Sequence, residues 1–287
     1  MNVLELRDVS YTYNPGTPFE KIALDHINLG FEEGKITGII GHTGSGKSTL
    51  AQLLNGLEKP TSGEVLLRGE NIWKEPKKIT KIRFRVGLVM QYPEYQLFDE
   101  TVGADIGFGP RNMGLSDEEI AQRVSEAARF AGLTPDMMDK SPFDLSGGQK
   151  RRVAIAGVLA MRPEILVLDE PAAGLDPRGR AEILGGLRAY QQEQNATVLL
   201  VSHSMEDMAR YCDNIVVMNH GKIHSTGTVS EVFSDSEELL RVGLNIPEIA
   251  HIANGLLRRG IALKGDLYTV EGVRAAILSY LKEGSQC

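Results

Sequence analysis

Short apolar runs alternate with amphipathic and polar stretches through most of this sequence. The runs span four or five residues each, which is typical of buried strands: 36–40, 86–90, 165–168, 197–201 and 215–218. Between them, residues 47–57 have helical character, and the segment 101–140 is mainly helical. Strands that alternate with helices favour a largely parallel sheet covered on both faces, which is an α/β fold.

The N-terminal stretch and the helical segment carry local signals of their own. Residues 3–6 and 11–13 are predicted as short strands, followed by a turn at 14–16. Ser116 and Glu119 have the spacing of a capping box, which predicts a helix from here to about residue 131.

The C-terminal part contains none of the chemical motifs described below. A helix is predicted to begin at Pro247, and a turn is expected at Gly265. An amphipathic stripe follows it: Val273, Ile277, Tyr280 and Leu281. The chain is therefore divided into a domain at 1–230, with a helical subdomain at about 99–160, and a C-terminal extension at 231–287. We expect the extension to be packed and to serve as an interaction surface.

Composition and charge narrow the function classes. The 287 residues carry a formal net charge of −7, so no broad nucleic-acid footprint is expected. A basic stretch at 74–85 is predicted to be a solvated edge or loop, with a membrane-facing or partner-facing role as the alternative. The two cysteines, Cys212 and Cys287, form no ligand pattern and fit a reducing cytoplasm. No apolar run reaches the ~18 residues of a membrane span, so any membrane role should be peripheral.

A glycine-rich loop lies between a predicted strand and a predicted helix. It matches the phosphate-binding pattern GxxxxGK[ST]: Gly41, His42, Thr43, Gly44, Ser45, Gly46, Lys47, Ser48 and Thr49. Glycines let backbone N–H groups approach an anion, and the start of the following helix adds positive potential there. Lys47 is expected to reach the β- and γ-phosphates, and Ser48 to offer its hydroxyl to Mg²⁺.

Two carboxylates follow the apolar run at 165–168. Ligands bind at the carboxyl ends of parallel strands, which is where Asp169 and Glu170 are expected to lie. Asp169 is placed to hold the magnesium shell, and Glu170 to polarise the attacking water. Adjacent carboxylates repel each other unless a cation compensates, and Mg²⁺ supplies that charge.

The segment Leu145, Ser146, Gly147, Gly148 and Gln149 has two readings. Ser146 and Gln149 form a capping box, which predicts a helix that runs to about residue 161. Glycines in the first turn are costly for a helix, at about 1 kcal/mol each, and their use is to expose N–H groups to something that comes close. With a phosphate loop upstream, this second anion-binding helix end suggests a nucleotide gripped from two sides.

In this order and spacing, residues 1 to about 230 resemble an ABC transporter nucleotide-binding subunit. Further positions match that family: Tyr13 as the aromatic residue that stacks on adenine, with Tyr11 as an alternative; Gln91 in the Q-loop; Asp176 in the D-loop; and His203 as the switch histidine. The implied fold is a P-loop NTPase of ABC type, with an N-terminal antiparallel β part, a mainly parallel core sheet, a helical subdomain and a small C-terminal extension.

The resemblance also implies ATP and Mg²⁺ as cofactors, and a head-to-tail pair of ATPase subunits. Each ATP would lie between the phosphate loop of one chain and residues 145–149 of the other. Glu170 would be the general base, with Lys47 and His203 as catalytic partners. Ser48, Gln91 and Asp169 would serve the metal, and Gln91 would link it to the membrane partner.

A narrower resemblance is to the second ATPase of energy-coupling factor transporters. It rests on the extended Q-loop at 91–98, on residues 145–177 and on Gly107–Pro110. The implied coupling residues are Gln91, Tyr95, Gln96 and Phe98. The implied partners are a non-identical second ATPase, a transmembrane scaffold and a substrate-binding membrane protein, at the cytoplasmic face of the cell membrane. Such systems import vitamins or transition-metal ions, and the choice of cargo lies outside the ATPase.

Three alternatives stay open at this point. One is the ATPase of another ABC importer, such as a homodimeric cobalt or nickel importer. Another is a soluble ABC ATPase acting on DNA or ribosomes, which the single cassette, the lack of sustained heptads and the two cysteines disfavour. The last is a P-loop kinase, which leaves residues 145–149 and His203 unexplained.

Overall fold

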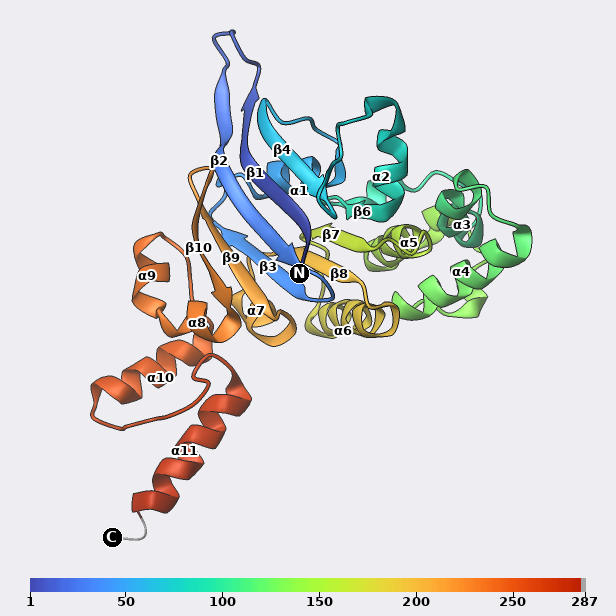
Figure 1. Ribbon diagram of the computed structural model, residues 1–287. Coiled ribbons are helices and arrows are strands. Elements are labelled where there is room, and N and C mark those ends of the chain that lie inside the picture. The colour runs from blue at the N-terminus through green and yellow to red at the C-terminus, as the bar shows by residue number, and fades with distance from the viewer. Residues whose placement is uncertain (285–287) are drawn as a thin grey trace.

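The computed structural model describes residues 1–284, so Cys287 lies outside the described residues. Within them the strands form two sheets, and helix α1 (Lys47–Asn55) packs between these sheets (Figure 1). No helix in this range combines the length and the apolar character needed to cross a bilayer.

The core sheet consists of the apolar runs predicted above and one edge strand. Its members, in spatial order, are β10 (Lys222–Thr228), β9 (Asn214–Asn219), β3 (Ile36–Gly41), β8 (Thr197–Val201), β7 (Ile165–Asp169) and β6 (Val86–Val89). All neighbouring pairs are parallel except β10 with β9. The prediction of a mainly parallel sheet is therefore confirmed, and only the partly exposed antiparallel edge strand β10 was missed.

Both faces of the core sheet are covered, which explains why its parallel strands carry apolar residues on both faces. In β7, Ile165 and Val167 join the cluster beneath α1, whereas Leu166 and Leu168 join the cluster on the opposite face. That opposite face is covered by α5 (Gly147–Leu159), α6 (Pro177–Gln194) and α7 (Met205–Tyr211). The parallel strands thus end together at one edge, and the site lies there.

The second sheet is antiparallel, in the order β2 (Lys21–Glu32), β1 (Asn2–Tyr13), β4 (Ser62–Leu67) and β5 (Glu70–Asn71). The two short N-terminal strands predicted from the sequence are one strand, β1, with irregular register between Leu6 and Val9. Asp8 there has a φ of 50°, in the left-handed region, which interrupts the apolar alternation and hides the continuity of the strand.

Helices α3 (Val102–Asn112) and α4 (Asp117–Phe130) pack beside α5 and follow the predicted helical segment. The capping box at Ser116 is present, with its hydroxyl accepting from the Glu119 N–H. The basic stretch at 74–85 is not a loop: it forms a 3₁₀ turn, η1 (Pro76–Lys78), and helix α2 (Ile79–Arg85). The stretch is solvated as expected, since Lys74, Lys77, Lys78 and Lys81 are exposed. Only the expectation of a loop was wrong, because α2 is short and has no buried residue to give it a clear periodic pattern.

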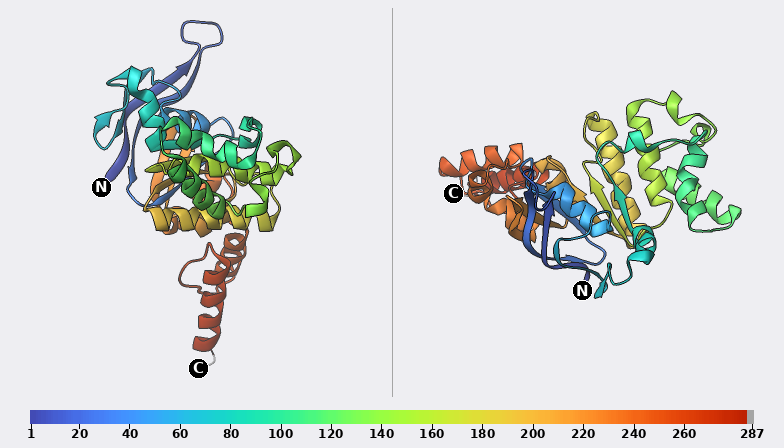
Figure 2. Two further views of the ribbon diagram at one scale, coloured as in Figure 1. Left: turned by 90° about the vertical axis from the view of Figure 1, so that its right-hand side faces the viewer. Right: turned by 90° about the horizontal axis from the view of Figure 1, so that it is seen from above.

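The C-terminal part contains α8 (Val229–Ser234), α9 (Ser236–Arg241), α10 (Glu248–Arg258) and α11 (Val270–Gly284). Figures 1 and 2 show α10 and α11 projecting from the body, at the end opposite to α3 and α4. These two helices bury a small apolar cluster of their own, which includes Ala253 and Val273. The predicted stripe continues past the cluster, and Tyr280 is 38% exposed.

Candidate nucleotide-binding site

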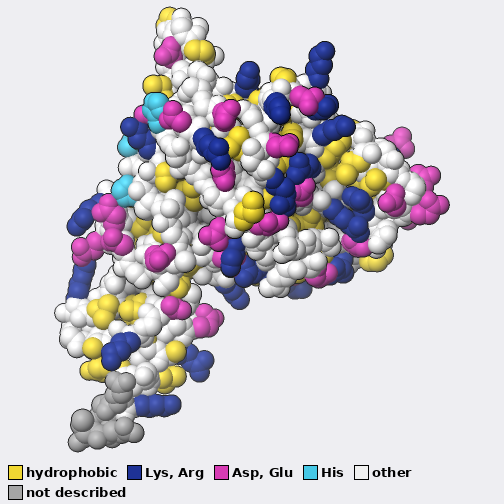
Figure 3. Space-filling model, in the orientation of Figure 1, with side chains coloured by type: hydrophobic (Ala, Val, Ile, Leu, Met, Phe, Trp, Pro, Cys, Tyr) yellow, Lys and Arg dark blue, Asp and Glu magenta, His cyan; other side chains and the backbone are white. Residues whose placement is uncertain are grey.

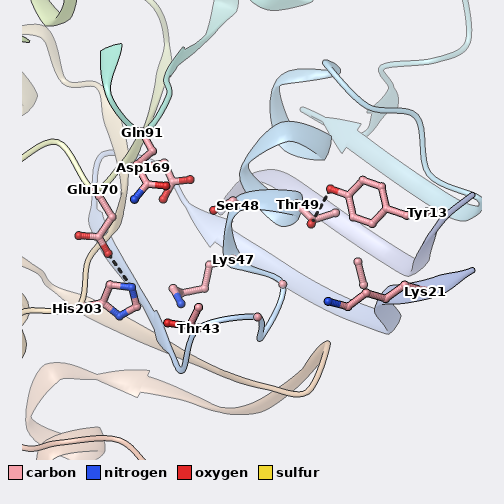
Figure 4. Close-up of a pocket in the computed structure, with 13 residues that line it drawn as sticks. Tyr13, Lys21, Thr43, Lys47, Ser48, Thr49, Gln91, Asp169, Glu170 and His203 are labelled. Atoms are coloured by element: carbon pink, nitrogen blue, oxygen red, sulfur yellow. Dashed lines mark hydrogen bonds and ion pairs between the residues drawn. The ribbon is translucent and has the colours of Figure 1, made fainter. Parts of the chain in front are cut away.

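A cavity of about 310 Å³ lies where the carboxyl ends of the core strands meet α1 and the antiparallel sheet. Its lining residues come from distant parts of the sequence: Tyr13, Lys21, Ala23, Thr43, Gly44, Gly46, Lys47, Ser48, Thr49, Gln91, Asp169, Glu170 and His203. In Figure 4, Gln91, Asp169, Glu170 and His203 lie on one side, Tyr13, Lys21 and Thr49 on the other, and Lys47 and Ser48 between them. The cavity therefore brings together eleven of the predicted site residues, mainly those expected to bind the phosphates, the metal and the attacking water.

The loop between β3 and α1 has the backbone of an anion cradle. Gly46 has a φ of 102°, and a Cβ there would stand 2.6 Å from the carbonyl oxygen of Ala23, so only glycine fits. Gly44 has a φ of 81° and faces open space. No side chain within residues 1–284 caps the N-terminus of α1. Its first N–H groups and the positive end of its dipole are thus available to an anion.

Lys47 places a buried positive charge in this cradle. Its Nζ donates to the carbonyl oxygens of Gly41, at 2.8 Å, and of His42, at 3.1 Å. The side chain is held by neutral acceptors, and the residue is only 7% exposed. Burial lowers the pKa of Lys47, while Glu170 and Asp169 act in the opposite direction. The ammonium group thus lacks a full counter-charge, which an anion in the cavity would provide.

Asp169 and Glu170 lie at the end of β7, as expected, and both are buried. Glu170 has a φ of 53°, unusual for a residue with a side chain, while its N–H still donates to the Val201 carbonyl at 3.0 Å. Burial, together with the neighbouring Asp169, raises the pKa of Glu170 to about 7. This carboxyl group therefore titrates near neutral pH, which suits a group that accepts a proton.

His203 is the second residue after β8, and its side chain lies next to Glu170 on the same side of the cavity (Figure 4). Its Nε2 lies 3.3 Å from Oε1 of Glu170. Burial and the nearby Lys47 lower the pKa of His203. The imidazole is therefore biased towards its neutral form in the free protein, and the pair is not a fixed ion pair at neutral pH.

Tyr13, and not Tyr11, is the aromatic residue that lines the cavity. Its hydroxyl lies 3.0 Å from Oγ1 of Thr49 on α1. Tyr11 instead donates to Glu58 at 2.7 Å, and burial, followed by this bond, raises its pKa to about 12. Lys21 was missed by sequence analysis because nothing local marks it. It reaches the cavity because it pairs with Tyr13 across β1 and β2.

Some predicted residues do not line the cavity. Ser45 is fully buried beneath the loop, and Gly41 ends β3. The imidazole of His42 lies against that of His220, with ring centroids 4.6 Å apart, and its Nε2 is 3.0 Å from Oδ1 of Asn219. These residues shape the loop, and their side chains do not line the cavity.

Residues 145–149 also lie outside the cavity. Ser146 caps α5 as predicted: its hydroxyl accepts from the Gln149 N–H at 3.3 Å, and its own N–H donates to the Gln149 side chain at 3.0 Å. Ser146 and Gly147 are exposed. Asp176 caps α6, accepting from the Gly179 N–H at 2.7 Å. Within one chain, neither segment completes the nucleotide site.

The loop at 91–98 presents large side chains to solvent next to the cavity. Tyr95 is 85% exposed and Phe98 is 58% exposed, and the Phe98 ring packs edge-on against Phe108 with centroids 4.8 Å apart. In Figure 3, hydrophobic side chains gather between α2 and α3, with Lys and Arg side chains beside them. Gln91 thus lines the cavity, while Tyr95 and Phe98 of the same loop face outwards.

The chemistry of the cavity lining tests whether a nucleotide fits. Oε1 of Glu170 is buried in the cavity wall and, apart from Nε2 of His203, meets no polar partner in the described part of the chain. The cavity supplies cradle N–H groups and Lys47 for phosphate oxygens, and Ser48, Gln91 and Asp169 as oxygen donors. Oxygen donors next to a phosphate site are what Mg²⁺ prefers. The residues therefore fit a nucleoside triphosphate with a hard divalent cation.

A parallel sheet with a phosphate loop, strand-end carboxylates and a glycine-led helix defines the class: a P-loop ATPase of the ATP-binding-cassette type.

The model of the ABC transporter family matches residues 24–173, and that of an AAA domain (putative AbiEii toxin, type IV toxin–antitoxin system) matches residues 139–208. Energy-coupling factor transporter ATP-binding proteins EcfA2 are close relatives. The one from Caldanaerobacter subterraneus is 52% identical over 97% of this chain and 98% of its own, and the one from Clostridium acetobutylicum is 50% identical over 99% of each.

Solved structures agree. CbiO1 from Clostridium perfringens, described as part of the ABC transporter complex cbiONQ, has a TM-score of 0.75 and 41% identity, covering 88% of this chain and 99% of its own. A dimeric ATP-binding cassette in a post-hydrolysis state with ADP and Pi has a TM-score of 0.72 and 30% identity, covering 79% and 98%. The chain therefore belongs to the ABC transporter family, among the energy-coupling factor ATP-binding proteins of the EcfA2 type. It is an ATP hydrolase coupled to transport and a membrane-associated transporter component.

Proposed function

We propose that this chain binds ATP with Mg²⁺ in the cavity and hydrolyses it to energise the import of a micronutrient. The observation that carries the proposal is the convergence of Lys47, an uncapped helix N-terminus and a carboxyl group of raised pKa in one cavity. Tyr13 would stack on adenine, and the loop at 41–49 would enclose the phosphates.

The roles of the remaining cavity residues follow from their chemistry. Ser48, Gln91 and Asp169 would hold Mg²⁺, which neutralises phosphate charge when bound. Glu170 would accept a proton from the attacking water, and its buried position keeps competing solvent away. Neutral His203 can donate a hydrogen bond, and it would contact the γ-phosphate.

A head-to-tail pair would complete the site. Residues 145–149 and Asp176 lie outside the cavity of their own chain, and Ser146 and Gly147 expose a helix N-terminus to solvent. Placed over the cavity of a second ATPase, they would bind its nucleotide from the opposite side. The A2 naming of the relatives favours a non-identical partner chain.

The membrane side of the assembly would be the loop at 91–98. Its exposed aromatic side chains are suited to a transmembrane scaffold, which would join a separate substrate-binding membrane protein. Gln91, Tyr95, Gln96 and Phe98 would couple docking to the nucleotide, at the cytoplasmic face of the membrane. The cargo, a vitamin or a transition-metal ion, would be chosen by that membrane protein, since the cavity of this chain is built for a nucleotide.

The second candidate is a homodimeric ATPase of another ABC importer, such as one for cobalt or nickel, since the similar CbiO1 is described as part of a different complex, cbiONQ. Affinity purification of the tagged chain from gently solubilised membranes, followed by mass spectrometry, tests both. A non-identical ATPase with a transmembrane scaffold and small membrane proteins would support the energy-coupling factor assembly. This chain with a single permease would favour the homodimer, and ribosomes or DNA-repair proteins alone would refute a transport role.

A further inference from the structure

A buried ion pair joins the loop at 91–98 to the helix that begins at Gly147. Arg151 of α5 donates from Nε to Oε2 of Glu94 at 3.0 Å and from Nη2 to Oε1 at 2.8 Å. Glu94 belongs to a 3₁₀ turn, η2 (Pro93–Gln96). Arg151 is only 5% exposed, and the Glu94 side chain is 16% exposed. The pair is therefore bidentate and largely shielded from water, unlike the many ion pairs on the surface.

The same guanidinium reaches a third segment. Its Nη1 donates to the carbonyl oxygen of Ala173, in the stretch between the end of β7 and the start of α6. Its Cζ also lies 6.0 Å from the centroid of the Tyr92 ring. Arg151 thus touches residues on either side of Pro93 and fixes the backbone beyond Glu170.

Each buried charge of the pair, on Glu94 and on Arg151, is compensated by the other. Burial alone would raise the pKa of Glu94, but its hydrogen bonds to Arg151 hold that pKa below the ordinary value. The planar guanidinium reaches both Glu94 oxygens and the Ala173 carbonyl from three separate nitrogens, an arrangement that the single nitrogen of an ammonium group does not reproduce. Loss of either partner leaves a buried charge without compensation.

The location of these contacts suggests what they do. Glu94 is three residues beyond Gln91, and Ala173 is three residues beyond Glu170, so both segments begin in the cavity. Arg151 itself lies just beyond the first turn of α5, whose exposed N-terminus is capped by Ser146. One side chain therefore ties together the outward-facing loop, the glycine-led helix and the backbone that follows Glu170.

We propose that Glu94 and Arg151 are a positioning pair, through which a partner docked on the loop at 91–98 sets the placement of residues 145–149 and 170–176. The contacts of the pair are a feature of the structure, and its effect on ATP turnover rests on the proposed function. Movement of the loop must carry Arg151 with it or break a buried bidentate contact. Docking would thereby control ATP turnover without any contact between the partner and the nucleotide.

Hydrogen–deuterium exchange on the full chain tests the linkage directly. Glu94→Gln changes the loop alone, and Glu94 has no hydrogen bond to residues 170–176 among those that the structure describes. We expect this variant, and also Arg151→Lys, to raise exchange several-fold at the Glu170, Ala173 and Leu175 amides. The control is Glu182→Gln, which breaks the ion pair of the next residue on the helix, Arg152. Faster exchange confined to 91–98 in Glu94→Gln would overturn the proposal. If Arg151→Lys does not fold, Glu94→Gln carries the test.

ATP turnover then separates this inference from the proposed function. In the isolated chain, both variants should keep a KM for ATP within about threefold of wild type, because no cavity residue changes. In the complex purified from membranes, kcat should fall by about tenfold, whereas Glu182→Gln should change the isolated and assembled rates alike. Equal losses in both settings for Glu94→Gln would reject the positioning role. If the wild-type chain captured no membrane partner, the proposed function would be rejected instead. The hydrogen–deuterium exchange experiment would still show whether Glu94 and Arg151 link the loop at 91–98 to residues 170–176.

Discussion

Three ionisable residues at the centre of the cavity are each less than 10% exposed: Lys47, Asp169 and Glu170. Their positions follow from the backbone, because Lys47 begins a helix and the carboxylates end a strand. Buried charges shift one another's pKa values, and the shifts at Lys47 and Glu170 both favour the neutral form. At the residue scale, the site is therefore poised for a ligand that brings charge of its own.

Replacement of Lys47 by alanine should abolish ATP binding or reduce it by at least about a hundredfold, because the phosphates lose their main counter-ion. Equilibrium binding of a fluorescent ATP analogue measures this. Lys21→Ala is the matched control, since Lys21 lines the same cavity beside Tyr13 but outside the phosphate loop. Normal ATP turnover in Lys47→Ala would remove the phosphate-loop assignment.

Glu170→Gln should retain ATP binding and lose hydrolysis by about a hundredfold or more, since an amide cannot accept the proton of the attacking water. Phosphate release under single-turnover conditions, compared with nucleotide affinity, separates the two effects. Undiminished turnover would assign the base role to another residue.

The raised pKa of Glu170 also predicts a pH dependence of stability in the nucleotide-free protein. Between about pH 4.5 and pH 7 the unfolded chain loses this proton while the folded chain keeps it, so folding stability falls as pH rises. Relative to Glu170→Gln, wild type should lose up to about 3 kcal/mol across this window, at about 1.4 kcal/mol per pKa unit. Urea denaturation of both proteins from pH 5 to pH 8 measures the difference. A constant difference would mean that Glu170 has an ordinary pKa.

Among the elements, the loop at 91–98 has side chains in three different surroundings. Its first residue, Gln91, lines the cavity, Glu94 is held by Arg151, and Tyr95 and Phe98 face solvent. Exposed aromatic side chains are typical of sites where another protein docks.

Alanine substitutions at Tyr95, Gln96 and Phe98 should leave the ATPase activity of the isolated chain within about twofold of wild type. They should reduce recovery of membrane partners by about tenfold or more, as expected for central aromatic contacts of an interface. Co-purification and ATPase assays on the same preparations test this. Phe19→Ala is a suitable control, because Phe19 is equally exposed but lies in the β1–β2 connection. An unchanged recovery of partners would place docking elsewhere.

The elements also differ in how well their sequences specify them. The buried strands and α4 follow from apolar runs and a capping box, and both kinds of signal are local. Helix α2 has no buried residue, and β2 could not be separated from the irregular N-terminal stretch. In both cases the conformation depends on what the segment packs against or pairs with, and no local pattern records that.

For the whole molecule, the separation of residues 145–149 from the cavity predicts action in trans. Ser146→Arg should impair hydrolysis of the nucleotide bound to the partner ATPase more strongly than that bound to this chain. Mixed dimers in which only one subunit retains its Lys47 equivalent measure the two sites separately. Ser116→Arg is the control, because it removes the same kind of capping box from α4. An effect confined to the cis nucleotide would refute the two-sided site.

The molecule as a whole places its two helical regions at opposite ends (Figures 1 and 2). The residues that line the cavity belong to the sheets, to α1 and to the loops beside them. Helices α10 and α11 bury their own small cluster and extend away from the main core. The division into a domain at 1–230 and an extension at 231–287 stays a prediction, as does the use of that extension as an interaction surface.

By itself, the sequence determined the local parts: the phosphate loop, the carboxylates that end β7, the cap of α5 and the strands of the core. These depend on backbone preferences and on alternating burial, which a few neighbouring residues specify. Only the tertiary structure decided which of these parts meet. It placed Tyr13 and Lys21 in the cavity through strand pairing, turned the His42 side chain towards His220, and joined Glu94 to Arg151, 57 residues apart. Such contacts join residues that are far apart in the sequence, so a pattern of neighbouring residues cannot predict them.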